Sequence, residues 1–389
     1  MVQTEYSSRS VLLPKLVEQG AVDAPEGSPD QGVAWHLGDP LGEQRAAVGG
    51  AILVDRSHRG VIELDGPERL SWLHTISSQF VSNLPDRRSA ENLNLDGNGR
   101  VLDHFVVTDV DGVTYLDTEA DRVAELLAFL QKMVFWAKVE PVARPDLAVL
   151  TLIGPGFLSG PIADLLELPA DVAVYQAGDL PEQHHDAEPQ GFWRVMPPIG
   201  VHRTLPTLDL VVPSSQLDGW WAQLDEAGAR PAGSWAHEAH RVAAVLPRLG
   251  RDTDERTIPH EVDWIGGRDE LGAVHLEKGC YRGQETVARV HNLGRSPRHL
   301  VLLQLDGSAG ERPQTGTEVT AAGRVVGRLG TVVDHYDYGP IALALVKRSV
   351  PVDADLVVDG VAARIDPNSI RVDDRVQAGR AAIDGLRGR

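Results

Sequence analysis

The chain has 389 residues, a hydrophobic fraction of 42% and a formal net charge of −19, from 37 basic and 56 acidic residues. This length exceeds that of a usual single domain, so we expect two or three units with substantial cores. The negative charge opposes attraction to nucleic acid and anionic lipid, so neither is expected as a partner.

The chain's single cysteine excludes an intrachain disulfide and any zinc or iron–sulfur site built from several cysteines, and no metal site is predicted. No apolar run approaches the roughly 20 residues of a membrane span. The polar start MVQTEYSSRS lacks the apolar core of a signal peptide. We therefore expect a cytoplasmic protein.

The elements expected before residue 296 are mixed. Residues 1–50 combine proline, glycine and charge with weak periodicity, which predicts a loosely structured N-terminal segment. The turn Asp96-Gly97-Asn98-Gly99 predicts a hairpin between strands at 93–95 and 101–108, and a helix follows at about 119–131. Further short strands and helices make residues 51–295 an α+β body rather than a strict βαβ repeat.

The pattern changes after Ser296-Pro297. Closely spaced strands with glycine turns and no helical period predict a small antiparallel barrel at 296–370. Its strands are expected at 298–305, 318–321, 324–333, 341–346, 356–358 and 362–365. Residues 371–389 are interpreted as a tail.

Residues 278–285, Lys-Gly-Cys-Tyr-Arg-Gly-Gln-Glu, surround the one cysteine with charged and hydrogen-bonding side chains. The residues from Tyr281 to Val290 predict a helix, which would put Cys280 at or near its N-terminus. Unpaired N–H groups there, together with Lys278, would favour the thiolate. The sequence therefore predicts Cys280 as a reactive group assisted by Lys278, although Lys278 can also be read as a solvated charge.

This octet, continued by Thr286, Val287, Ala288 and Arg289, resembles the signature of the YgfZ family. Members of that family are related to the glycine-cleavage T-protein, an aminomethyltransferase; they bind folate and support iron–sulfur enzymes. The resemblance covers about residues 54–348. It implies an α+β fold in which a body of two intertwined parts and a C-terminal antiparallel β-barrel form a ring-like arrangement, with folate entering the central opening.

The resemblance also implies folate contacts along the predicted helix, at Tyr281, Gln284, Glu285 and Arg289. For Lys278, binding of the anionic tail of a folate is a third reading beside assistance to the thiol and a solvated charge. The alternative for Glu285 and Arg289 is an ordinary surface ion pair at i,i+4 spacing.

Two further stretches resemble T-protein motifs with changes. Arg241 matches an arginine that opens a pterin-binding stretch, but the acidic position is Ala243, which cannot accept the pterin's hydrogen bonds. Glu261 could supply the missing acceptor, or belong to an exposed acidic loop.

Asp103 and His104 stand where the transferase has paired aspartates. Asp103 could act on a folate nitrogen, or be a strand residue that points to solvent.

The resemblance therefore implies a protein that binds tetrahydrofolate, or a one-carbon derivative of it, and assists assembly or repair of iron–sulfur client enzymes. Whether it has a folate-dependent, transferase-like activity of its own stays open. Two alternatives remain. One is a true aminomethyltransferase, which Ala243 and His104 disfavour; the other is a non-catalytic adaptor that docks client enzymes.

Overall fold

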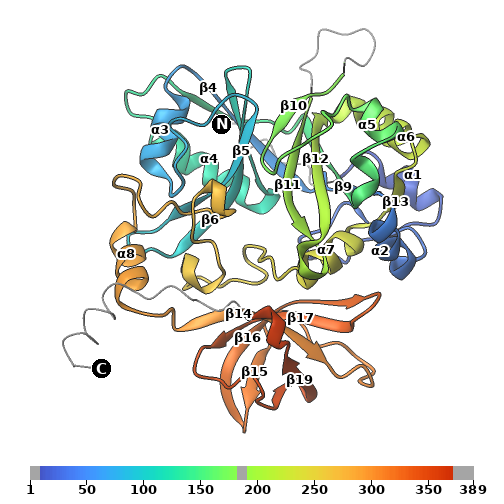
Figure 1. Ribbon diagram of the computed structural model, residues 1–389, viewed down its shortest axis with the longest axis vertical. Coiled ribbons are helices and arrows are strands. Elements are labelled where there is room, and N and C mark those ends of the chain that lie inside the picture. The colour runs from blue at the N-terminus through green and yellow to red at the C-terminus, as the bar shows by residue number, and fades with distance from the viewer. Residues whose placement is uncertain (1–8, 182–190, 371–389) are drawn as a thin grey trace. The chain divides into compact units, whose positions relative to one another are not determined.

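The computed structural model describes residues 9–181 and 191–370, and Figure 1 traces the chain. Within these residues the chain divides into two units, each built from separate segments. Unit 1 takes in the residues up to His74, Val81–Glu91 and Phe105–Ala244. Unit 2 takes in Thr75–Phe80, Asn92–His104 and the residues from Val245 onward. The sequence assigned residues 245–295 to the body, whereas here they belong to the unit that contains the barrel strands.

Unit 1 contains a six-stranded sheet in the order β10-β11-β12-β9-β3-β13, antiparallel except for the pair β3 and β13. The strands are β3 (Ile52–Asp55), β9 (Leu147–Ile153), β10 (Ala177–Asp179), β11 (Phe192–Ile199), β12 (Leu205–Pro213) and β13 (Arg230–Ala232). Every residue of β9 is buried, as its continuous apolar run predicts. The helices of this part of the unit are α5 (Pro161–Leu165), α6 (Leu217–Glu226) and α7 (Ser234–Ala243).

Residues 9–50, the described part of the N-terminal segment, differ from the loosely structured segment that we expected. They form α1 (Leu13–Glu18), β1 (Val22–Asp23), β2 (Ala34–His36) and α2 (Pro40–Gly49). Leu12, Leu13 and Leu16 are buried in the same apolar cluster as the β9 residues Leu150 and Leu152. A short apolar run at helical spacing is enough to anchor the segment, because a large core is available to receive it. Pro25, Gly27, Pro29, Gly32 and Gly38 lie in the turns and loops between these elements, whereas Pro14, Pro40, Gly42 and Gly49 belong to the helices.

The second sheet has five strands in the order β5-β6-β7-β4-β8, and β5 and β6 contribute residues to both units. The strands are β4 (Arg59–Asp65), β5 (Arg88–Leu95), β6 (Val101–Val110), β7 (Val113–Glu119) and β8 (Glu140–Ala143), accompanied by α3 (Arg69–Ile76) and α4 (Val123–Lys132). The predicted hairpin is present. The Asp96 carboxylate accepts hydrogen bonds from the N–H groups of Asn98 and Arg100, each at 2.8 Å, which holds its tight turn.

The C-terminal strands close into a six-stranded antiparallel barrel, so the α+β fold with a C-terminal barrel is confirmed. They are β14 (Arg298–Leu305), β15 (Glu318–Ala321), β16 (Arg324–His335), β17 (Gly339–Lys347), β18 (Leu356–Val358) and β19 (Val361–Ile365). Alternate residues of β14, Val301, Leu303 and Leu305, lie in the barrel core. The predicted tail at 371–389 lies outside the described residues. No helix in the described part of the chain is long and apolar enough to cross a bilayer.

Candidate functional site

The octet at 278–285 leads into α8 (Gln284–Leu293) and packs against the hairpin loop between β5 and β6. Gly283 precedes the helix with φ +83°. A Cβ on Gly283 would lie 2.6 Å from the Asp96 carbonyl oxygen, and a Cβ on Gly99 would lie 2.9 Å from that of Thr286. Both distances are too short for a side chain. Two motifs far apart in the sequence therefore form one interlocked structure within unit 2.

Cys280 lies in the loop before this helix, and its side chain is exposed. The helix begins at Gln284 rather than at Tyr281, because the left-handed backbone at Gly283 delays its start. The expected helix start at Tyr281 is therefore wrong, and Cys280 lies near the helix N-terminus but outside its first turn. The thiol is instead accessible to a reactant or to another macromolecule.

Lys278 is buried, and its ammonium group is bound by the segment at 77–79. Nζ donates hydrogen bonds to the carbonyl oxygens of Ser77, at 2.6 Å, and Gln79, at 3.1 Å, and lies 5.2 Å from the centre of the Tyr281 ring. Burial lowers the pKa of Lys278 to about 7. The side chain therefore ties the octet to a remote backbone segment and is only partly charged at neutral pH. Its role as a partner of Cys280 stays a prediction.

The four predicted folate contacts after Cys280 divide into two pairs. Tyr281 is buried, and burial raises its pKa to about 12, so the phenol stays neutral. The Gln284 amide donates to the carbonyl oxygen of Lys278 at 3.3 Å and closes the loop on itself. Glu285 and Arg289 are exposed on α8. Tyr281 and Gln284 thus shape the loop, whereas Glu285 and Arg289 are presented to solvent.

Asp103, on β6, is buried, and the Asn94 amide donates to its Oδ2 at 2.8 Å. The alternative of a strand residue that points to solvent is therefore wrong. The neighbouring His104 ring stacks on Trp264, with centroids 4.6 Å apart and planes 12° apart. Asp103 and the octet belong to the same unit, and the hairpin loop that contacts the octet leads directly into β6.

Glu261 is buried at the end of a short 3-10 helix, and its carboxylate is held by Arg298 at the start of β14. Nε and Nη2 of Arg298 donate to Oε1 and Oε2 of Glu261, both at 2.8 Å. Arg298 also donates to both oxygens of Asp254, at 2.5 and 3.0 Å. Burial opposes ionisation of Asp254, but the hydrogen bonds from Arg298 and Thr257 lower its pKa to about 2. Glu261 is therefore neither an exposed loop residue nor an unpaired acceptor.

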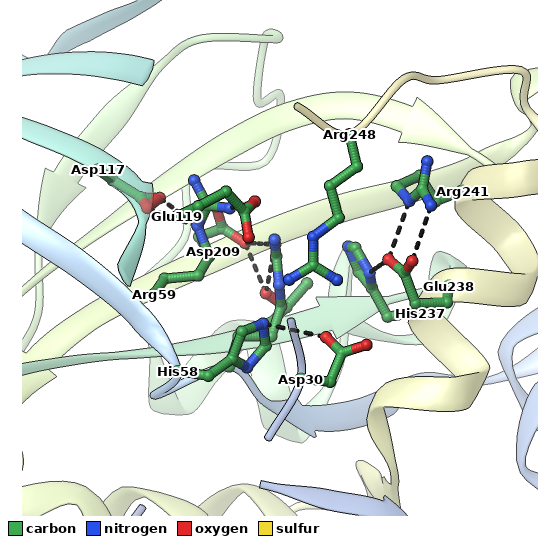
Figure 2. Close-up of polar contacts among 12 residues, drawn as sticks. Asp30, His58, Arg59, Asp117, Glu119, Asp209, His237, Glu238, Arg241 and Arg248 are labelled. Carbon is green, nitrogen blue, oxygen red and sulfur yellow. Dashed lines mark hydrogen bonds and ion pairs between the residues drawn. The ribbon is translucent and has the colours of Figure 1, made fainter. Parts of the chain in front are cut away.

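Arg241 belongs to unit 1 and makes a bidentate contact with Glu238, one turn earlier on α7 (Figure 2). Its Nε and Nη2 lie 2.9 and 2.7 Å from the two Glu238 oxygens. Nδ1 of His237 lies 3.4 Å from the same carboxylate. Burial, with the nearby charge of Arg56, lowers the pKa of His237 to about 4, so His237 is neutral at pH 7. Glu238, for which the sequence predicted no role, is the acidic partner of Arg241.

The sequence did not indicate a buried ion network in unit 1, of which Figure 2 labels Arg59, Asp117, Glu119 and Asp209. Arg194, on β11, is completely buried and contacts both Asp117, on β7, and Asp209, on β12. Asp117 also accepts from Arg59, which reaches Glu119 at 2.7 Å. The network joins the five-stranded sheet to the six-stranded sheet. Its signal in the sequence is a charge inside an apolar strand, as in Trp193-Arg194-Val195, and we interpret the network as structural.

The C-terminal barrel matches a known protein family. Residues 298–370 match the family model of the CAF17 C-terminal beta-barrel domain. These residues begin at the first strand of the closed barrel and end just beyond its last.

Similarity over a longer part of the chain leads to aminomethyltransferases. The chain is 28% identical over 252 residues to an aminomethyltransferase of Methylococcus capsulatus. The aligned region covers 62% of this chain and 67% of the relative. It is 26% identical over 287 residues to a putative chloroplastic transferase of Arabidopsis thaliana, covering 72% of this chain and 61% of that protein. The chain thus spans between 61% and 67% of the length of these curated relatives.

The solved structure of the glycine cleavage system aminomethyltransferase T from Bartonella henselae has the same fold. It superposes with a TM-score of 0.74 and covers 90% of this chain and 94% of its own, at 18% sequence identity. This likeness confirms the predicted fold class. The matches together confirm the resemblance that the octet indicated.

Proposed function

Because the chain joins a CAF17-type barrel to a fold distantly related to T-protein aminomethyltransferases, we propose that it binds tetrahydrofolate and assists assembly or repair of iron–sulfur enzymes. The observation that carries the proposal is the interlock between the octet and the hairpin loop. It joins an exposed thiol, Cys280, to the hairpin whose second strand holds the buried carboxylate Asp103. An exposed thiol can reach a client protein, whereas a buried carboxylate suits a small ligand.

The donor and acceptor set of unit 2 fits a folate in part. A pterin offers ring and amino N–H groups, which need carboxylate or carbonyl acceptors. Asp103 is such an acceptor, and the amide hydrogen bond from Asn94 orients it. The buried Tyr281 would hold the loop in position beside the ligand, and the exposed Arg289 adds a cation for an anionic tail. A folate would supply one-carbon chemistry when bound; this chain's residues would bind it and keep the Asp103 carboxylate in position.

The rival reading, aminomethyl transfer, is disfavoured by two residues. Ala243 is buried in α7 and offers only a methyl group at the position of the acidic pterin ligand. His104 replaces the second aspartate, and its ring is stacked on Trp264. Glu261 is not a ready substitute, because Arg298 already occupies both its oxygens. We expect negligible aminomethyl transfer from a lipoyl carrier, and robust turnover would favour the rival.

Titration calorimetry with tetrahydrofolate tests the proposal. Asp103→Asn keeps the shape but removes the charge, so we expect affinity to fall by about tenfold or more, as for loss of a charged hydrogen bond. Asp306→Asn, in an exposed loop of the same unit, is the matched control and should bind as the wild type does. Absence of binding at millimolar ligand would remove folate from the account.

A substitution of Cys280 distinguishes the proposed function from the alternative of a non-catalytic adaptor. If the protein only docks client enzymes, Cys280→Ser should restore iron–sulfur enzyme activity fully in a cell that lacks the native protein. If the thiol takes part in chemistry, the variant should bind folate normally and fail to restore that activity. Roles for Lys278, Gln284 and Glu285 in folate binding, in the same unit as Asp103, are part of the same proposal and are tested by the same titration.

A further inference from the structure

A second exposed surface lies far from the octet in sequence, at the turn between α4 and β8 in unit 1. Trp136 is 95% exposed and Phe135 is 73% exposed, the highest values among the exposed large hydrophobic side chains in the described residues. The other seven of the chain's eight tryptophans are buried or half-buried. Exposed aromatic residues of this kind are typical of protein contact surfaces, where tryptophan is enriched.

The turn that carries this pair is held at both ends. The N–H of Ala137 donates to the Val134 carbonyl oxygen at 2.8 Å, so Phe135 and Trp136 occupy the two central positions of a closed turn. The Trp72 indole donates to the carbonyl oxygen of the residue before the turn, at 2.9 Å. The rings are therefore presented by a pre-organised backbone, which reduces the entropy lost on binding.

The backbone at Phe135 is strained. Its φ of +45° lies in the left-handed region, which glycine and asparagine adopt readily and bulky residues rarely do. Phenylalanine therefore destabilises the turn locally, and at 73% exposure it gains little from burial in return. The aromatic pair does not serve the stability of the fold, and strain of this kind is concentrated at binding and catalytic sites.

Positive charge flanks the pair. Lys132 and Lys138 are both exposed, and they are two of only five lysines in a chain with net charge −19. No acidic residue occurs between them, and the nearby Glu68 carboxylate is bound to the backbone N–H of Lys138 at 2.6 Å. We propose that this aromatic turn, residues 132–138, docks a partner protein whose surface offers an apolar pocket bordered by carboxylates.

A protein fits this turn better than a lipid surface does. An extended anionic bilayer would face the negative charge of much of the chain, whereas a small acidic pocket approaches only the turn and its two lysines, because salt screens more distant charges. A pocket on a protein can enclose two neighbouring rings and place carboxylates beside the lysines. The inference does not rest on folate binding, since no residue of the aromatic turn belongs to unit 2.

Short helical peptides provide the probe. One peptide carries leucines on one face with glutamates beside them; a second replaces the glutamates by lysines, and a third replaces the leucines by glutamines. The full chain should bind the first peptide at least about tenfold more tightly than the others, because apolar contact and charge both contribute. Acrylamide quenching of tryptophan fluorescence should fall on binding, since Trp136 is the fully exposed indole.

Single-residue variants distinguish a loss of peptide binding from a loss of folding. Trp136→Ala should weaken peptide binding by about tenfold or more. Phe135→Gly should also weaken it while leaving the melting temperature unchanged or higher, because glycine relieves the left-handed strain. Val325→Ala removes an exposed apolar side chain elsewhere and should bind as the wild type does. Lys132→Gln with Lys138→Gln should remove the preference for glutamate, whereas Lys347→Gln should not.

Four results would overturn the proposal. The three peptides could bind equally, or Trp136→Ala could bind as well as the wild type. Phosphatidylglycerol vesicles could shift the Trp136 emission where the acidic peptide does not, which would identify a lipid surface. Sedimentation could show a dimer that Trp136→Ala abolishes, which would make a second copy of this chain the occupant.

Discussion

Arg298 donates to both carboxylate oxygens of Glu261, at 2.8 Å each, and so connects the start of the barrel to the 3-10 helix before it. Because Glu261 is buried and Arg298 is partly buried, the two charges depend on each other. This pairing limits how the Glu261 carboxylate can bind a ligand. A ligand that needs the carboxylate must compete with a bidentate guanidinium.

Arg298→Ala should therefore destabilise the protein by about 3–5 kcal/mol, since it leaves the buried Glu261 carboxylate without its cation. Urea unfolding of the full chain measures this. Arg364→Ala removes an arginine from an exposed pair with Asp355 and is the control, with an expected effect below about 1 kcal/mol. Equal losses of unfolding free energy in the two variants would show that the buried pair contributes no more to stability than the exposed pair.

Lys278 predicts a dependence of stability on pH. Its pKa is about 7 in the folded chain, against an ordinary value of 10.5. Between these values the unfolded chain binds more protons than the folded one, so the lysine's contribution to the free energy of unfolding rises with pH. Relative to Lys278→Met, the wild type should gain on the order of 2–4 kcal/mol between pH 7 and the ordinary lysine value.

The measurement is urea unfolding of both proteins at neutral and alkaline pH. Lys347→Met, at an exposed position, controls for the loss of a lysine as such. A difference between wild type and Lys278→Met that stays constant with pH would contradict the buried, partly deprotonated ammonium.

The two glycines of the octet should respond differently to alanine. At Gly283 a Cβ would meet the Asp96 carbonyl oxygen at 2.6 Å, and φ is +83°. At Gly279 nothing lies within 4 Å and φ is not positive. Gly283→Ala should destabilise the chain by about 1–3 kcal/mol, whereas Gly279→Ala should be neutral or slightly stabilising. Thermal unfolding distinguishes them, and equal melting temperatures would refute the interlock with the hairpin loop.

Cys280→Ser should keep the melting temperature within a few degrees of the wild type, because an exposed side chain contributes little to stability. It should nevertheless lose the ability to restore iron–sulfur enzyme activity in cells. Calorimetry with tetrahydrofolate provides the control, since normal folate binding would show that the site is intact. Full restoration by the variant would assign the thiol no chemical role.

Local patterns were enough to predict several elements. The six barrel strands and the 93–108 hairpin were identified from alternation and turn residues, which act over a few positions. The octet was identified because its residue types and spacing are distinctive in themselves. The helix after it was predicted to begin at Tyr281, because the sequence does not show that Gly283 adopts a left-handed backbone.

The tertiary structure decided the partners of the charged residues. The octet sequence does not indicate that Lys278 binds the carbonyl oxygens of Ser77 and Gln79. Nor does any local signal pair Arg298 with Glu261, or Arg194 with Asp209. The physical reason is that local propensity determines the backbone conformation, whereas a buried charge must find its counter-charge or carbonyl wherever the folded chain brings one close.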